Sequence, residues 1–209
     1  MPRTGARGGP QTRARIAEAA AALFLVRGFD EVTVAEVARE AGVSSVTVFK
    51  HFPRKEDLFL DRSDEAVDLL RAAVRDRTGD VLGSLRATTL RLVEERHPLS
   101  GVDERSLPFF RTVAASPALI ARAREIAADL QRTLSEELRD DPGFDGDGPL
   151  LAALFLAGYA TVTVETARRI VAGEAPTTVV ADHRARFEVL FDALTRTGIE
   201  RRAEGTGSV

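Results

Sequence analysis

Apolar residues recur along this chain at the three- and four-residue spacing of amphipathic helices. The only competing strand signals are two short β-branched runs, at residues 161–164 and 177–180. The first lies inside a longer helical pattern, and the second precedes a predicted helix. The pattern therefore predicts an all-α fold of about nine helices. After three helices near the N-terminus, the predicted segments are 55–77, 80–96, 104–115, 117–139, 149–173 and 181–197.

The first three predicted helices are short and separated by glycine. The first starts near Thr12 and ends at Arg27, and Gly28 follows where a left-handed cap is typical. Thr33 opens the second with the capping-box pattern Thr-x-x-Glu. Gly42 then supplies a turn, because a residue without Cβ tolerates positive φ. Short helices joined by such a turn are typical of a helix-turn-helix.

The third predicted helix has one inward and one outward side. At about 100° per residue, Val48 and Phe52 point inward, with Ser45 beside them. Hydroxyl and ammonium groups can bond phosphates or base edges, and a valine can rest on a thymine methyl. The outward side is therefore suited to the DNA major groove. Its residues are Val46, Thr47 and Lys50, flanked by Phe49 and His51.

Arg54 and Lys55 stand at the start of the predicted helix 55–77. The positive end of a helix dipole disfavours cations, although it attracts anions. These two residues are therefore either solvated surface charges or half of a phosphate site. Beside a helix-turn-helix, the phosphate site is the favoured interpretation.

A longer motif resembles the DNA-binding signature of the TetR family of regulators. It covers about residues 12–60 and includes Thr33-Val34-x-x-Val37-Ala38-x-x-Ala41-Gly42-Val43-Ser44 and then Thr47-Val48-Phe49-x-His51-Phe52-Pro53-x-Lys55-Glu56-Asp57-Leu58-Phe59. The resemblance implies an Ω-shaped all-α homodimer that binds palindromic double-stranded operator DNA. It also implies four regions: a flexible arm at 1–11, a DNA-binding domain at 12–54, a ligand-binding and dimerisation domain at 55–198, and a flexible tail at 199–209.

The implied function is a repressor that a small, hydrophobic inducer releases from its operator. The alternative is a constitutive or partner-dependent regulator without an inducer. By position, the residues that match frequent DNA contacts of the family are Arg13, Arg15, Thr33, Ser44, Ser45, Val46, Thr47, Phe49, Lys50, His51 and Lys55. Phe49 replaces the family's usual Tyr, whose hydroxyl often bonds a phosphate. Val46 replaces a common Gly or Ala.

Two groups of residues in the C-terminal part are candidates for a ligand pocket and a dimer interface. Aromatic residues at helical spacing can line a cavity, although they more often pack in the core. The pocket candidates are Phe109, Phe110, Phe155 and Tyr159. Small and apolar faces on two helices favour a four-helix interface. The interface candidates are Ala153, Ala157, Ala160, Val164, Phe187, Leu190, Phe191 and Leu194.

Composition adds only modest constraints. The net charge is −3, yet residues 1–62 carry ten Lys and Arg against eight Asp and Glu. The chain has no cysteine, and its three histidines lie far apart, so we expect neither a metal site nor a cofactor. No catalytic constellation is visible, and we expect a regulator and not an enzyme. No apolar run reaches the roughly 20 residues that span a bilayer, which predicts a cytoplasmic protein without a membrane partner.

Overall fold

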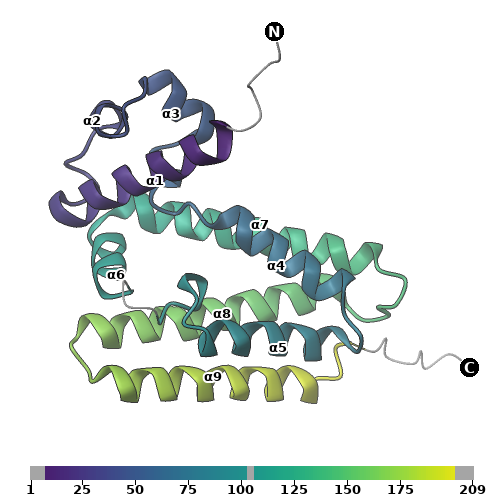
Figure 1. Cartoon of the computed structure of the whole chain (residues 1–209). Coiled ribbons are helices and arrows are strands. Elements are labelled where there is room, and N and C mark those ends of the chain that lie inside the picture. Colours follow the sequence, from purple (N-terminus) through teal and green to yellow (C-terminus); the bar gives the residue numbers. More distant parts are fainter. Residues whose placement is uncertain (1–7, 103–105, 201–209) are drawn as a thin grey trace, which may run out of the picture. The chain divides into compact units, whose positions relative to one another are not determined.

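Helices account for most of the chain that the structure, a computed structural model, describes: residues 8–102 and 106–200 (Figure 1). The all-α prediction is confirmed, because no β-strand occurs in these ranges. Of the expected flexible ends, 1–11 and 199–209, residues 1–7 and 201–209 lie outside these ranges. The expected arm was wrong for residues 8–11, because α1 begins at Gly8 and not near Thr12. The described α-helices are α1 (Gly8–Arg27), α2 (Val34–Glu40), α3 (Ser45–His51), α4 (Ser63–Arg75), α5 (Val81–Glu94), α6 (Ser106–Ala115), α7 (Pro117–Asp140), α8 (Gly148–Val171) and α9 (Pro176–Arg196), and the 3-10 helices are η1 (Glu56–Leu58) and η2 (Pro98–Ser100).

The chain divides into two compact units. The first comprises Met1–Asp61 and Pro108–Ala123, and the second comprises Arg62–Leu107 and Arg124–Val209. The boundary proposed from sequence was residue 54. In the structure the first unit continues to residue 61 and takes in a segment far away in sequence, the corner between α6 and α7.

The first unit is built around the inner stripe of α1. Ile16 and Phe24 on that stripe are completely buried, as is Val48 of α3. The predicted left-handed positions are confirmed: Gly28 has φ 86° and Gly42 has φ 64°. Side chains with a Cβ rarely adopt such angles. The glycines therefore end α1 and turn the chain between α2 and α3.

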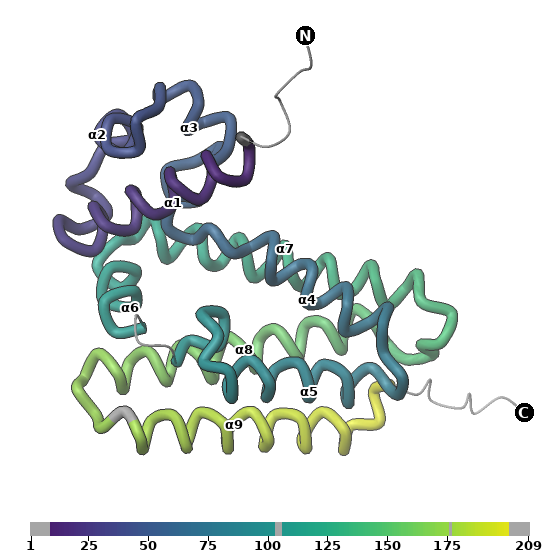
Figure 2. The backbone as a smooth tube through the Cα atoms, in the orientation of Figure 1, coloured from purple at the N-terminus to yellow at the C-terminus, as the bar shows by residue number. Residues whose placement is uncertain are grey.

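In the second unit, α5, α8 and α9 run side by side (Figure 2). Leu85, Leu151 and Phe191 are buried between them. Gly158 permits the close approach of α8 and α9, because a Cβ there would lie 2.3 Å from Leu190 Cδ1. This packing places one side of α8 and one side of α9 inside the unit.

Some predicted boundaries were wrong. The helix expected over 55–77 is interrupted: η1 spans three residues and α4 begins only at Ser63. Helix α9 begins at Pro176, so the β-branched run 177–180 is helical. By length and composition α8 could cross a membrane, but a core helix passes the same test. Leu151, Phe155 and Val162 of α8 are indeed buried in the unit.

Candidate nucleic-acid interface

Helix α2 is held by the predicted capping box, which is confirmed. The backbone N–H of Glu36 donates to Thr33 Oγ1 at 3.3 Å, and Thr33 N donates to Glu36 Oε2 at 2.8 Å. Hydrogen bonds from Thr33 and from the Arg27 guanidinium lower the pKa of Glu36 to about 2. The Thr33 hydroxyl also donates to Glu36 at 2.9 Å. Thr33 therefore serves first to position α2.

Ser44 caps the next helix. Its Oγ accepts a hydrogen bond from Thr47 N at 3.1 Å and shares another with Thr47 Oγ1 at 2.9 Å. A side-chain cap of this kind stabilises a helix by about 1 kcal/mol. Both hydroxyls thus take part in fixing the start of α3.

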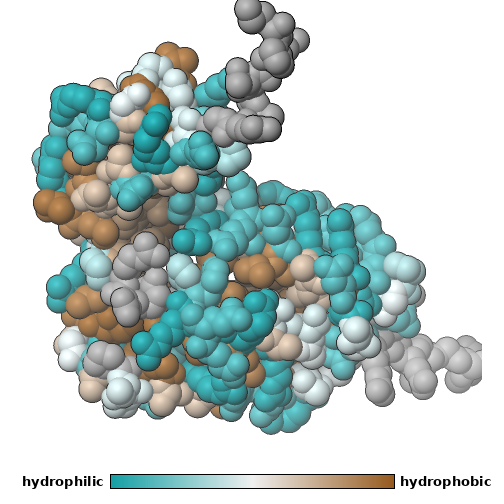
Figure 3. All heavy atoms as spheres, viewed as in Figure 1, coloured by the Kyte–Doolittle hydropathy of each residue, from teal (hydrophilic) through white to brown (hydrophobic). Residues whose placement is uncertain are grey.

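The two sides of α3 differ as predicted. Val48 and Phe52 are buried in the core of the first unit. On the opposite side, Val46 is 79% exposed and Phe49 is 50% exposed, and Lys50 is exposed beside them. Hydrophobic atoms reach the surface over α3 in Figure 3. The helix therefore presents a mixed apolar and cationic face to solvent.

Two cations that the sequence assigned to DNA have partners inside the unit. Arg13 Nη2 donates to the backbone oxygen of Asp61 at 3.0 Å, and its guanidinium lies 4.6 Å from the Phe52 ring centroid. Lys55 Nζ lies 4.2 Å from the centroid of the Phe29 ring. The predicted helix 55–77 does not start there, because only the 3-10 helix η1 follows Lys55, so the helix-dipole argument for a phosphate site does not apply, and a phosphate contact stays a prediction. Arg13 and Lys55 tie α1 to the segment that follows α3.

The corner between α6 and α7 is held within the first unit by side-chain hydrogen bonds that the sequence did not indicate. Ser116 Oγ donates to Asp30 Oδ1 at 2.9 Å, and Arg122 Nε donates to Asp57 Oδ1 at 2.8 Å. These partners are 86 and 65 residues apart in sequence. Only Pro117 marked the corner, and nothing in the local pattern named its partners.

The predicted pocket residues fall in different units. The Phe109 ring stacks on Phe59 at 5.0 Å in the core of the first unit, and Phe110 packs edge-on to Phe109. Phe155 and Tyr159 lie on α8 in the second unit. The four residues are thus divided between two cores, which favours the core-packing alternative for the phenylalanines.

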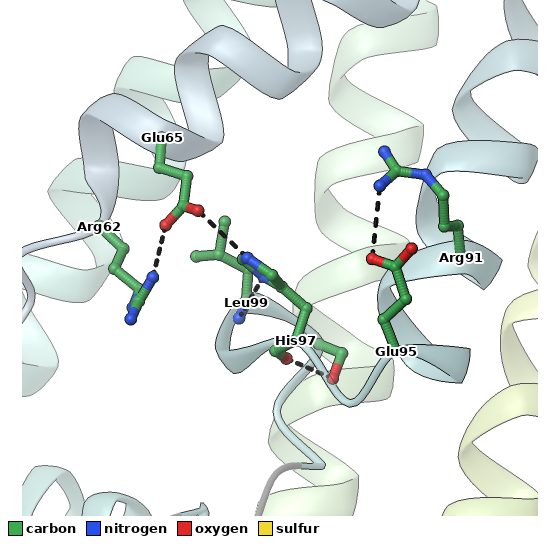
Figure 4. Close-up of polar contacts among 7 residues, drawn as sticks. Arg62, Glu65, Arg91, Glu95, His97 and Leu99 are labelled. Atoms are coloured by element: carbon green, nitrogen blue, oxygen red, sulfur yellow. Dashed lines mark hydrogen bonds and ion pairs between the residues drawn. The ribbon is translucent and has the colours of Figure 1, made fainter.

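Tyr159 nevertheless takes part in a chain of polar contacts. Its hydroxyl donates to the Leu99 carbonyl at 2.9 Å, and burial raises the pKa of its phenol. Leu99 N donates to His97 Nδ1 at 3.3 Å, so the proton of the neutral ring sits on Nε2, which lies 3.1 Å from Glu65 Oε1. Glu65 also pairs with Arg62 at 2.7 Å (Figure 4). We call Tyr159, Leu99, His97, Glu65 and Arg62 the polar relay; it links α8 to the first turn of α4.

The predicted interface requires correction. Phe187, Phe191 and Leu194 are buried inside the second unit, so they are unavailable to another molecule. The sequence pattern identified the apolar side of α9 but not the direction in which it faces. Ala157, Ala160 and Val164 of α8 are exposed, whereas Ala153 and Leu190 are partly buried. The large exposed apolar residues of α8 are Leu150, Leu154, Val164 and Val171. Together with the exposed Ala157 and Ala160 they form what we call the outer face of α8.

A shallow hollow of about 340 Å³ adjoins this outer face and is lined by Ala160, Thr161, Val164, Glu165, Arg168 and Arg186. On the inner side of α9, His183 is fully buried and shares a 2.7 Å hydrogen bond with Thr166 Oγ1. Burial lowers the pKa of His183 to about 4. The described residues contain no cluster of three metal-binding side chains.

An exposed recognition helix on a capped helix-turn-helix, in an all-α chain, defines a DNA-binding transcription regulator. Comparison with known proteins supports the predicted resemblance. Residues 16–61 match the family model for bacterial regulatory proteins of the tetR family. The predicted resemblance to the TetR family is therefore confirmed over this N-terminal segment.

Three similar proteins extend this assignment. The HTH-type transcriptional regulator TtgR of Pseudomonas putida is 37% identical over 41% of this chain and 42% of its own length. The nucleoid occlusion factor SlmA of Edwardsiella ictaluri is 28% identical over 62% of this chain and 69% of its own length. The crystal structure of FadR from Thermus thermophilus, a TetR-family transcriptional repressor in complex with lauroyl-CoA, superposes with a TM-score of 0.53. It is 26% identical and covers 94% of this chain and all of its own.

Proposed function

We propose that this protein is a cytoplasmic transcriptional repressor that binds palindromic operator DNA as a homodimer. The outward side of α3 carries this proposal, since it presents Val46, Phe49 and Lys50 to solvent from a helix whose other side is buried. A rigid helix with this arrangement fits the major groove. Each subunit of the dimer reads one half-site.

The DNA-contacting residues divide by chemistry. Val46, Thr47, Phe49 and Lys50 face the base edges. Positively charged and polar groups around them contact the sugar-phosphate backbone; these are Arg15, Ser44, Ser45 and His51. Thr33, Arg13 and Lys55 act chiefly by holding the helices in place, because their side chains already have partners within the unit.

Homodimerisation places the outer face of α8 against a second copy. Four large apolar side chains of this face are at least one-third exposed. Single exposed apolar residues are ordinary, but several along one side of a helix are typical of an interface. Val189 of α9, which is 64% exposed, extends the apolar surface onto the neighbouring helix.

A small hydrophobic molecule releases the repressor in this proposal. FadR of Thermus thermophilus was crystallised with lauroyl-CoA, and this chain superposes on it along nearly its whole length. The polar relay offers a route by which ligand binding can act on the first unit. It runs from Tyr159 to Arg62, which directly follows residue 61 of that unit. A ligand that displaces the Tyr159 hydroxyl from Leu99 would loosen the start of α4.

Selection of fragments from the protein's own genomic DNA tests operator binding. We expect enrichment of a palindrome whose half-sites lie one helical turn or a multiple apart. Lys50→Ala and Thr47→Ala should reduce that enrichment. Arg139→Ala, which removes a cation that is exposed on α7, is the matched control and should leave it unchanged. Absence of any enriched palindrome would refute the proposal.

Ligand release is tested separately. A thermal-shift screen of acyl thioesters, apolar acids and aromatic compounds identifies binders, and each binder is then added to the operator complex. We expect release by a binder in the wild type and a weaker response in Tyr159→Phe, which lacks only the hydroxyl. If binders never release DNA, the regulator acts constitutively or through a partner. The similarity to a nucleoid occlusion factor favours this alternative as a second candidate function.

A further inference from the structure

The outward side of α3 has an apolar edge that takes no part in the core of the first unit. Val46 is 79% exposed and Phe49 is 50% exposed, and neither belongs to the buried cluster of the first unit or to the residues packed against it. They stand three positions apart and so share one side of the helix. Two neighbouring large apolar side chains on the side of α3 that would face DNA form a small surface that a partner's apolar group can cover.

The neighbouring polar group is already engaged. Thr47 donates its backbone N–H to Ser44 Oγ, and its hydroxyl shares a hydrogen bond with the same atom. A threonine in this state has less hydrogen-bonding capacity to offer a base edge. Lys50 is exposed, and no described residue forms a hydrogen bond or an ion pair with its ammonium group. The outward side therefore offers one exposed cation and one apolar edge.

The major groove displays a single apolar group, the C5-methyl of thymine. Val46 and Lys50 are one helical turn apart, about 5–6 Å, which corresponds to one or two base-pair steps of about 3.4 Å. We propose that Val46 and Phe49 read thymine methyl groups beside the base pair that Lys50 contacts. This inference rests on the proposed function, and it names the feature of the operator that gives specificity. The positive charge of Lys50 draws this edge onto the DNA.

Replacing thymine by deoxyuridine tests the proposal, because it removes the methyl and leaves every hydrogen-bonding group of the base pair in place. The substitution is made at each thymine of the selected operator in turn, and affinity is measured by fluorescence anisotropy. We expect a loss of about fourfold per methyl group at one or two positions of each half-site, the factor that corresponds to burial of one carbon group. All other thymines should tolerate the change.

Three variants assign the effect to its residues. Val46→Ala and Phe49→Ala should bind the thymine operator about fourfold more weakly, and each should lose its sensitivity to deoxyuridine at one position. Val26→Ala is the matched control, because Val26 is a more exposed valine of the same unit, on α1. It should behave as the wild type. Circular dichroism melting curves confirm that all three variants fold.

The outcomes separate the inference from the proposed function. Specific binding with a deoxyuridine penalty that disappears in Val46→Ala or Phe49→Ala supports methyl reading. Specific binding with no penalty at any position, or with the same penalty in the wild type and both variants, overturns methyl reading and leaves operator binding intact. Failure of the wild type to bind any sequence specifically overturns both.

Discussion

Among the helices that expose large apolar side chains, α3 and α8 differ in the surroundings of those side chains. On α3 the apolar edge is one turn long and adjoins Lys50. On α8 the outer face extends from Leu150 to Val171, nearly the whole helix. The first is small and next to a cation, and the second is long, with Thr161 and Arg168 exposed within it.

This difference indicates two kinds of partner. A short apolar edge with an adjacent positive charge matches a methyl group in a negatively charged groove. A long apolar row matches another apolar row, and burying the two together releases water from both. Exposure of apolar residues therefore has no single meaning; the length of the surface and the charges beside it determine what it binds.

The largest expected effect comes from placing charge on the outer face of α8. Leu154→Glu combined with Val164→Glu should separate the subunits, because paired carboxylates in an apolar interface are costly to bury. Operator affinity should then fall on the order of 100-fold or more, since each chain holds only one half-site. Sedimentation velocity and fluorescence anisotropy measure the two effects. Val26→Glu, in the other unit, is the control, and a double variant that remains dimeric would contradict this role of α8.

A smaller loss is expected on α3. Lys50→Ala should cost about 1–3 kcal/mol per half-site if the lysine contacts a base pair. Titrations at several salt concentrations distinguish a base contact from a phosphate contact, because loss of a phosphate contact lowers the salt dependence by about one unit per site. Unchanged affinity in Lys50→Ala would show that Lys50 makes no energetically important contact with DNA.

The inner side of α9 differs from both exposed surfaces, because its polar side chain His183 faces the core. The pKa of His183 is lowered to about 4 in the folded chain, whereas an unfolded histidine titrates near 6.5. Between these values the unfolded chain binds the proton more readily, so stability falls as the pH decreases from about 6.5 towards 4. Urea unfolding should give a free energy about 2 kcal/mol lower at pH 5 than at pH 7.5 from this residue. His183→Gln should lack that difference; an equal difference in both proteins would argue against it.

The smallest effect concerns the support of the recognition helix. Thr33→Ala removes the cap of α2 and should lower the free energy of unfolding by about 1 kcal/mol. Thr33→Ser retains a capping hydroxyl and should restore most of it. If operator affinity falls far more than stability in Thr33→Ala, then Thr33 also contacts DNA directly.

Local patterns in the sequence predicted the first unit well. The caps at Thr33 and Ser44 and the turns at Gly28 and Gly42 each depend on a few neighbouring residues. Such signals can be recognised without knowledge of the rest of the fold. The same holds for the buried and exposed sides of α3, which follow from helical periodicity once the helix is placed.

Distant contacts could not be predicted in this way. The apolar stripe of α9 was identified, but periodicity alone does not say whether Phe187 and Phe191 face their own core or a second subunit. The bonds of Ser116 and Arg122 join residues far apart in sequence. The charged run after Pro53 resembled a helix start, yet Asp57 accepts hydrogen bonds from Arg54 N and Arg122 there, and only a 3-10 turn forms.

The most direct test of the central claim is protection of guanine N7 atoms from dimethyl sulfate on the selected operator, because N7 lies in the major groove. We expect wild-type protein to protect two symmetric clusters, one helical turn or a multiple apart. Lys50→Ala should lose protection of the guanine that Lys50 contacts and retain the others. No protection in the major groove, or the same protection pattern in the wild type and in Lys50→Ala, would contradict the assignment of α3 as the recognition helix.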